Sequence, residues 1–335
     1  MRSRKFRLLL LVLLAGLAAV IRVLRHSSLQ QGKDEACDEK GAVVAKEGLQ
    51  AFDEREVERE SEGGVWRPWG DSGDGVCALH ETRFGRALPR VLLLSFPCSG
   101  NTWLRYLLEG AAGLFTASEF ADEELLRAGF LGEGEDPGSG RTLVQKSHGA
   151  VDKSRPDLAG RHEAVGPSTP AVLLLRDPRS FPFPKPEQSF RSGSFYPGRG
   201  TADTPPSWRP QDFQTNAFRG HVERMTSQWE ELATDRLLWN SAPLFVLHYE
   251  RLLMDPLGHL RKILRFLGMP VDEERLRCLA THLEGSFKRS GNEDFDPYTE
   301  EEKRRLSLAV ERVQRLLRLM GYPDQPLYEW QDALP

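Results

Sequence analysis

The sequence has little of what would assign a chemistry directly. Its 335 residues include only four cysteines and no C-x-x-C pair, which excludes a cysteine-based metal centre and a dense disulfide framework. It has no G-x-x-x-x-G-K-[ST] motif, so an ATP-hydrolysing phosphate-binding loop is disfavoured. The formal net charge is only −4, and this near balance indicates no nucleic-acid partner. We predict no metal site.

Long apolar runs are scarce as well. The uncharged run of residues 8–21 has 14 residues, fewer than the roughly 20 that a membrane-spanning helix usually needs. A basic leader precedes it, and Arg7 and Arg22 can extend the span by reaching to the interfaces. We therefore predict that residues 1–28 form a cytoplasmic leader and an uncleaved signal anchor. A cleaved signal peptide is the alternative, although no small-x-small site follows the run.

Residues 29–88 are acidic and contain many glycines. They hold 14 Asp and Glu against 8 Lys and Arg, and they have few apolar residues to bury. We predict a stem here, in which tryptophans such as Trp69 begin the packing onto a domain at residues 89–335. In an oxidising compartment Cys37 and Cys77 are able to pair, and two unpaired thiols are the equal alternative.

The domain opens on residues 90–103, which join a strand to a helix through a tight turn. The apolar residues Val91–Leu94 indicate a strand buried on both faces. The run breaks at Pro97 and Gly100, and apolar residues recur at helical spacing from Trp103. Backbone N–H groups of such a turn face one point, which predicts a cradle for a phosphate-type anion. An ordinary strand–helix turn is the alternative. The side chains that add donors here are Ser99, Asn101 and Thr102.

Strands and helices alternate along the rest of the domain. Short apolar runs predict the strands, and apolar residues at helical spacing predict the helices. The predicted strands are Thr142–Gln145, Ala171–Leu175 and Leu244–Tyr249, and the predicted helices lie within residues 218–232, 257–267 and 299–320. This order is typical of a parallel α/β sheet. We predict a three-layer fold with helices on both faces of a central parallel sheet, whose ligands bind at the carboxyl ends of the strands.

Charged side chains follow two of these strands. Lys146 and His148 are two residues apart and therefore face the same side of their strand. A neutral His148 can remove a proton, while Lys146 neutralises charge on a transferred group. Arg176 ends the next strand with a guanidinium suited to two-point contact with a phosphate. The structural alternatives are a buried histidine and a surface ion pair.

Two further segments bear on the site. Residues 285–291 form a basic loop between helices that is able to bind a second phosphate, and a solvated linker is the alternative. Residues 180–187 carry three prolines, which exclude a helix there. We predict that they belong to a long loop at the mouth of the site.

The order of these motifs resembles that of the sulfotransferases, which transfer sulfate from 3′-phosphoadenosine 5′-phosphosulfate (PAPS). The motifs are P-x-S-G-x-T-W at Pro97–Trp103, K-S-H at Lys146–His148, R-D-P at Arg176–Pro178, Y-E at Tyr249–Glu250, F-L-G at Phe266–Gly268 and the basic loop led by Phe287. The WSC-domain-containing group, Golgi type II membrane proteins associated with the sulfation of sialic acid, is the most similar. That likeness is carried by Phe96–Trp103, Gly129–Glu133, His248–Glu250 and Gly285–Arg289. This sequence carries none of the cysteine-rich WSC domains.

The resemblance implies a P-loop-like fold, no metal and a role for each matching residue. His148 would be the general base, assisted by Lys146. The turn would hold the 5′-phosphosulfate, and Trp103 would lie beside the adenine. Arg176 and the basic loop would bind the 3′-phosphate. The implied PAPS-binding residues are Ser99, Gly100, Asn101, Thr102, Trp103, Arg176, Lys288, Arg289 and Gly291.

This sequence departs from the family pattern at two positions in the site. Cys98 stands where most sulfotransferases have a lysine that stabilises the leaving phosphate, which shifts that duty to Lys146 or to another cation. Pro184 stands where a serine is expected to bind the 3′-phosphate, and Ser180 and Ser189 are the possible substitutes.

We therefore predict a Golgi, single-pass type II membrane sulfotransferase with its catalytic domain in the lumen. The predicted acceptor is a hydroxyl of a glycan, with sialic acid as a candidate, on glycoprotein or glycolipid. A catalytically impaired relative that binds nucleotide or glycan is the alternative that Cys98 leaves open. A kinase is disfavoured by the missing lysine motif. The predicted partners are the glycan acceptor and the membrane, and the sequence indicates no oligomeric state.

Overall fold

Five parallel strands form the centre of the computed structural model, which describes residues 52–54, 56–61, 63–149, 157–180, 213–285 and 296–326. The strands are β1 (Leu92–Ser95), β2 (Ala117–Ser118), β3 (Gln145–Ser147), β4 (Ala171–Leu175) and β5 (Leu244–His248). They lie in the order β2-β3-β1-β4-β5, and every pair is parallel. β1 therefore lies at the centre, with Leu92 opposite both Gln145 and Ala171. The predicted parallel sheet is confirmed.

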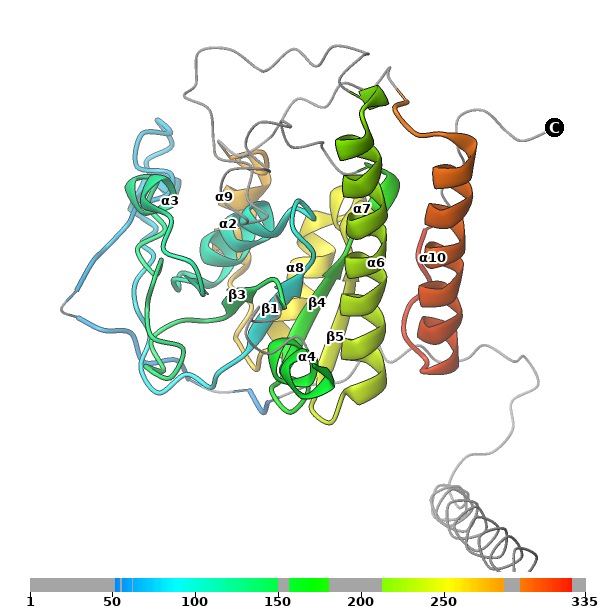
Figure 1. The fold of residues 1–335 in the computed structure, drawn as a ribbon. Helices are drawn as coiled ribbons and strands as arrows, with labels where there is room; N and C mark the ends of the chain where they lie inside the picture. Colours follow the sequence, from blue (N-terminus) through cyan, green and yellow to red (C-terminus); the bar gives the residue numbers. More distant parts are fainter. Residues whose placement is uncertain are drawn as a thin grey trace, which may run out of the picture. The chain divides into compact units, whose positions relative to one another are not determined.

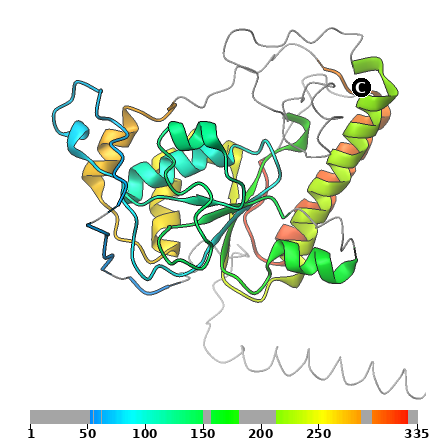
Figure 2. The same ribbon diagram turned by 60° about the vertical axis from the view of Figure 1, so that its left-hand side comes forward.

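Helices cover both faces of this sheet (Figures 1 and 2). One face carries α2 (Asn101–Ala112), α8 (Pro256–Phe266) and α9 (Glu273–Ala280), and the other carries α4 (Leu158–Val165), α6 (Asn216–Trp239) and α10 (Glu300–Leu319). Side chains of each strand alternate between the two cores, so Leu93 joins the first and Leu92 and Leu94 join the second. Two shorter helices, α3 (Glu123–Arg127) and α7 (Tyr249–Met254), follow β2 and β5. The predicted three-layer arrangement is confirmed.

Local sequence signals set most of the element boundaries. β4 covers the predicted residues Ala171–Leu175, and α10 begins with the capping box between Thr299 and Glu302. The prediction is wrong for the second strand, because β3 begins at Gln145 rather than at Thr142. β3 pairs with β1 only from Leu92 onward, so residues before Gln145 have no place in that ladder. Because β3 runs from Gln145 to Ser147, Lys146 lies within the strand rather than after it.

The described part of the predicted stem packs on the α2 side of the domain. Trp69 is only 2% exposed and joins the core beneath α2, α8 and α9. Cys77, which begins the short 3-10 helix η1 (Cys77–Leu79), forms a disulfide with Cys278 of α9. Both alternatives from the sequence, a Cys37–Cys77 pair and two unpaired thiols, are therefore wrong for Cys77. Packing against the core begins before residue 89, so a separate stem remains a prediction only for residues outside the described ranges.

The predicted membrane anchor and proline-rich loop lie elsewhere in the chain. Among the helices that the structure describes, none is long and apolar enough to cross a membrane. Residues 1–28, the predicted leader and anchor, lie outside the described residues, as do residues 181–187 of the predicted loop. The second 3-10 helix, η2 (Pro178–Ser180), ends where that loop begins.

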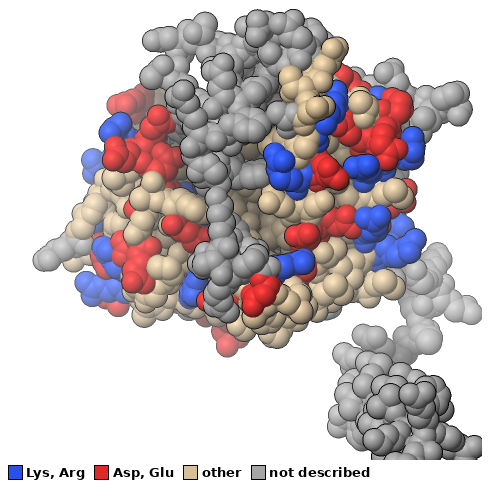
Figure 3. All heavy atoms as spheres, viewed as in Figure 1, with Lys and Arg blue, Asp and Glu red and all other residues tan. Residues whose placement is uncertain are grey.

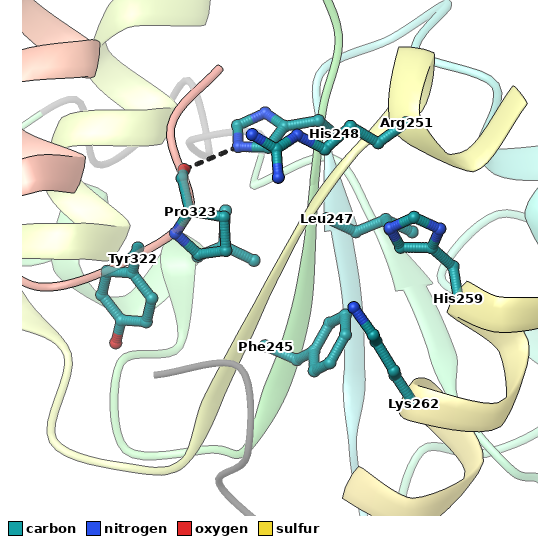
Figure 4. A pocket seen from close by; sticks show the side chains of 9 residues that line it. Phe245, Leu247, His248, Arg251, His259, Lys262, Tyr322 and Pro323 are labelled. Atoms are coloured by element: carbon teal, nitrogen blue, oxygen red, sulfur yellow. Dashed lines mark hydrogen bonds between the residues drawn. The ribbon is translucent and has the colours of Figure 1, made fainter. Parts of the chain in front are cut away.

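A pocket opens at the outer edge of β5, between α8 and the segment that follows α10 (Figure 4). At one end, His248 Nε2 donates to the Pro323 carbonyl oxygen at 2.9 Å. His259 and Lys262 reach from α8 toward the strand. Charged side chains along an edge strand oppose pairing with another chain. We therefore interpret this pocket as a protected sheet edge, distinct from the turn after β1.

Acidic and basic side chains are interspersed on the face of the molecule shown in Figure 3. On α6 and α10 they pair between the helices, Arg305 with Glu223 at 3.4 Å and Arg312 with Glu230 at 3.0 Å. Exposed pairs of this kind contribute at most about 1 kcal/mol each. The described residues of this face thus form no large field of one sign that would attract nucleic acid.

Candidate active site

The turn between β1 and α2 is shaped by two residues with left-handed backbone conformation. Cys98 has a φ of 67° and Gly100 a φ of 86°, on either side of Ser99. Gly100 is the N-cap of α2, and no side chain caps the helix there. The first N–H groups of α2 have no partners within the helix, and the helix dipole favours an anion beside them.

Ser99 and Asn101 are buried inside this turn. Asn101 Nδ2 donates to Ser95 Oγ at 2.9 Å, which ties the first residue of α2 to the last residue of β1. Ser99 Oγ is buried and has no hydrogen-bond partner among the described residues. Leaving a buried hydroxyl in this state costs about 1–3 kcal/mol. An oxygen of a bound phosphate or sulfate group would accept its hydrogen bond, so the turn fits the predicted anion cradle.

Tyr249, the first residue of α7, is the centre of a cluster beside the turn. A Cβ on Gly100 would lie 2.4 Å from Cε2 of the tyrosine, so glycine is needed for the backbone to approach the ring. Trp103 meets the ring edge-on, with centroids 5.9 Å apart. The guanidinium of Arg176 lies 4.4 Å from the ring centroid, and its Nη1 donates to the Cys98 carbonyl at 2.9 Å. The residue after β4 therefore supports the turn after β1.

Two side chains of α2 hold the segment that follows α9. Trp103 Nε1 donates to the Leu283 carbonyl at 2.7 Å, and the Tyr106 hydroxyl donates to the His282 carbonyl at 2.7 Å. Because this segment leads to Gly285, the predicted basic loop begins close to Trp103. The predicted ligands within the loop, Lys288, Arg289 and Gly291, lie outside the described residues.

His148 follows β3 and is anchored on the end of β1. Its Nδ1 lies 2.8 Å from the Ser95 carbonyl oxygen. A carbonyl oxygen only accepts, so Nδ1 carries the proton and Nε2 is the basic nitrogen. The ring of Phe120 stacks on the imidazole, with centroids 6.1 Å apart. Burial, reinforced by the charge of Lys146 and opposed by the Ser95 carbonyl, lowers the pKa of His148 to about 4. The imidazole is therefore neutral at pH 7, as a general base must be.

Lys146 brings a positive charge to the same edge of the sheet. It lies in β3, two residues before His148, and its charge acts on the imidazole. Only 7% of Lys146 is exposed, and it stands opposite Leu93 of β1 and Ser118 of β2. The structure thus gathers the predicted residues Ser99–Trp103, Lys146, His148 and Arg176 at the carboxyl ends of β1, β3 and β4. Among the described residues, no three His, Cys, Asp or Glu side chains are placed to hold a metal ion.

Tyr249 and Phe120 also lie in this site, and the motif pattern gave neither a role. Tyr249 directly follows β5, so the rule that ligands collect at strand ends is a signal that could have found it. Phe120 follows β2, and the two residues of that strand are too few to show a periodicity. The part of the site around Phe120 therefore left no readable pattern in the sequence.

Known sulfotransferases are similar to this chain. The model of the sulfotransferase domain matches residues 189–311. A WSCD family member of Drosophila pseudoobscura pseudoobscura is 36% identical over 211 residues, which are 62% of this chain and 60% of that relative. A WSCD family member of Drosophila melanogaster is 34% identical over 219 residues, which are 64% of this chain and 62% of that relative. This chain thus matches about 60% of the length of these relatives.

Two solved structures are similar at a lower level. Mouse sulfotransferase SULT7A1 complexed with PAP has 13% identity and a TM-score of 0.39, over 69% of this chain and 86% of the other. The sulfotransferase domain from the Curacin biosynthetic pathway has 18% identity and a TM-score of 0.33, over 72% and 100% of the two chains. The sequence comparisons carry the similarity: part of this chain is similar to the sulfotransferase domain and to WSCD family members, as the order of its motifs predicts.

Proposed function

We propose that this protein transfers sulfate from PAPS to a hydroxyl group of a glycan, with sialic acid as a candidate acceptor. The observation that carries the proposal is a buried Ser99 hydroxyl without a hydrogen-bond partner at the uncapped start of α2, with a neutral His148 anchored on the same strand end. An anion bound at this turn would accept hydrogen bonds from the Ser99 hydroxyl and the first N–H groups of α2. An acceptor hydroxyl beside the anion could give its proton to His148. The match to the sulfotransferase domain supports sulfate, rather than phosphate, as the group transferred.

In the proposed reaction the acceptor oxygen bonds to sulfur while the bond from sulfur to the leaving phosphate oxygen breaks. Nε2 of His148 takes the hydroxyl proton, because Nδ1 already carries a proton that it donates to Ser95. The first N–H groups of α2 and the Ser99 hydroxyl hold the phosphosulfate and stabilise the charge left on the phosphate. Lys146 adds a positive charge from the strand that carries the base.

The part of the site that contains Trp103 and Arg176 would hold the nucleotide. Trp103 offers a ring beside the adenine, and Arg176 a guanidinium for the 3′-phosphate, together with the predicted residues Lys288, Arg289 and Gly291. The contact of Arg176 with the Cys98 carbonyl brings a cation to the turn where most sulfotransferases have a lysine. This contact supports an active enzyme despite Cys98.

We further propose that the protein works in the Golgi lumen as a single-pass type II membrane protein. The disulfide Cys77–Cys278 supports an oxidising compartment, and the apolar run of residues 8–21 is the proposed anchor. Protease treatment of intact and permeabilised Golgi vesicles tests this topology. We expect the domain to be protected until the membrane is opened. Digestion in intact vesicles would refute a lumenal domain.

The proposed activity is tested with full-length protein in detergent, PAPS labelled with ³⁵S and a mixture of sialylated and desialylated glycans. Label on a glycan supports the transfer reaction, and loss of label after desialylation supports sialic acid as the acceptor. Binding of PAPS without transfer would support the alternative, a non-catalytic relative, which the cysteine at position 98 favours. Preference for ATP over PAPS would contradict both.

A further inference from the structure

The motif Gly129–Glu133, part of the family likeness but without an assigned role, encloses a buried guanidinium. A Cβ on Gly132 would lie 2.3 Å from the Thr116 carbonyl oxygen, so glycine is needed for this close approach. The ring of Phe130 lies 4.8 Å from the guanidinium carbon of Arg105. Glu133 forms an ion pair with the same guanidinium, and neither side chain is more than 1% exposed.

Arg105 links the helix of the anion cradle to the residues around β2. It lies about one turn after Asn101 on α2, so its place relative to the cradle is fixed. Nε donates to Thr116 Oγ1 at 2.7 Å, and Nη2 donates to the Thr116 carbonyl at 3.1 Å. The Thr116 hydroxyl donates in turn to Glu109 Oε1 at 2.6 Å. The remaining terminal nitrogen, Nη1, donates to Glu133.

Glu133 carries this link onward to residues beside His148. Its Oε2 accepts from the Asp122 N–H at 3.3 Å, and its backbone forms a bridge with Ser118. Ser118 Oγ accepts from the Phe120 N–H at 3.2 Å. Ser118 and Asp122 therefore fix both ends of the segment whose central residue, Phe120, stacks on His148. One buried carboxylate thus connects the cradle helix to the wall beside the imidazole.

We propose that Glu133 is a positioning residue for sulfate transfer, which locks segment 118–122 to α2 through Arg105 and so keeps His148 stacked under Phe120. This proposal rests on the role of His148 as the general base. Lys146 is the charged group that acts on His148, so Glu133 acts through position and not through its own charge. A buried ion pair adds little net stability, because the cost of desolvating both charges offsets their attraction. Its effect is therefore expected in the geometry around the base.

The test is the pKa of His148, measured by an NMR titration of histidine-labelled full-length protein. In Glu133→Gln, segment 118–122 should loosen, water should reach the imidazole, and the pKa should rise from about 4 toward the ordinary value of 6.5. The acidic limb of the pH profile of kcat/KM should shift to higher pH together with the pKa of His148. We expect kcat to fall about tenfold, while PAPS affinity changes less than about twofold because the turn keeps its contacts.

Glu135→Gln is the matched control, because the Glu135 carboxylate pairs with Arg141 at 3.0 Å and not with Arg105. It should change neither the pKa nor kcat. A folded Glu133→Gln protein in which the pKa of His148 stays near 4 would overturn the proposal.

Phe120→Ala decides the question if Glu133→Gln does not fold, because it removes the wall and leaves the ion pair in place. The same rise in the pKa of His148 is expected, and an unchanged pKa would again overturn the proposal. The titration needs no turnover. A shifted pKa in a protein that never transfers sulfate would therefore support the positioning role while refuting the proposed function.

Discussion

The two sides of the candidate site are held by different kinds of interaction. Beside the anion cradle, close approach and ring contacts dominate, with Tyr249 touching Gly100, Trp103 and Arg176. Beside His148, the wall is fixed by the buried ion pair of Arg105 with Glu133. Shape changes little with pH, whereas buried charges respond to it. The comparison teaches that the cradle depends on close steric fit and the wall beside the base on a buried ion pair, so each side should fail under a different perturbation.

The largest effect is expected on the side of the base. His148→Ala should lower kcat by about 10³-fold, because no other group would take the acceptor proton. PAPS affinity should be kept, since the turn after β1 does not depend on the imidazole. Label transfer and calorimetric titration measure the two quantities. His162→Ala, which removes an exposed histidine of α4, is the control and should leave both unchanged. Unchanged turnover in His148→Ala would remove His148 from the role of base.

Glu109, which lies in the hydrogen-bond network of Arg105, should make the free energy of unfolding of the protein depend on pH. Burial raises its pKa to about 7, against the lowering effects of Arg105 and the Thr116 hydroxyl. A carboxyl that holds its proton more tightly when folded stabilises the protein below pH 4.5, and this contribution is lost as the pH rises to about 7. The loss amounts to about 3 kcal/mol in the free energy of unfolding.

The comparison with Glu109→Gln isolates this carboxyl. Other buried groups, such as His148 and His248 with pKa values lowered to about 4, shift stability the opposite way but are common to both proteins. Urea unfolding between pH 4.5 and 8 should show the wild type losing about 3 kcal/mol relative to the variant. If the free energies of unfolding of the two proteins changed in parallel with pH, Glu109 would not titrate in this range.

On the cradle side, Gly100→Ala should break the contact with Tyr249. Gly73 provides a matched control, because its φ of 72° is also left-handed, whereas a Cβ there meets nothing within 4 Å. Both variants carry the backbone strain, and only Gly100→Ala adds the collision with the ring. We expect Gly100→Ala to lose about 2 kcal/mol more stability than Gly73→Ala and to bind PAPS about tenfold more weakly. Equal losses in the two variants would refute a steric role for the contact.

The sequence was sufficient wherever a local pattern determines the structure. The apolar run and the residues that break it predicted β1, the turn and α2, and the capping box at Thr299 predicted the start of α10. The prediction that a strand leads into Lys146–His148 agrees with β3, which ends at Ser147. β2 and α9 were not predicted, because two and eight residues give little periodicity to read.

The contacts that join distant residues could not be read from the sequence. Arg105 and Glu133 are 28 positions apart, and Cys77 and Cys278 are 201 apart, so no spacing rule connects them. Their pairing follows from how α2 and α9 pack on the sheet, which single-sequence patterns do not specify. The structure therefore added the support behind His148, whereas the roles of the site residues in binding PAPS remain predictions.

The smallest effect is expected for a substitution that keeps the positive charge at position 176 but changes the shape of the side chain that carries it. Arg176→Lys retains the positive charge but loses the guanidinium contact with the Tyr249 ring and the bond to the Cys98 carbonyl. A cation–π contact contributes about 1 kcal/mol, so KM for PAPS should rise about fivefold, while kcat stays within about twofold. Arg179→Lys, whose arginine pairs with Asp177 at 2.9 Å, is the control and should leave KM unchanged. If Arg176→Lys instead lowered kcat with KM intact, Arg176 would act on the departing phosphate in place of the lysine that Cys98 replaces, and the cradle side would depend on charge as much as the base does.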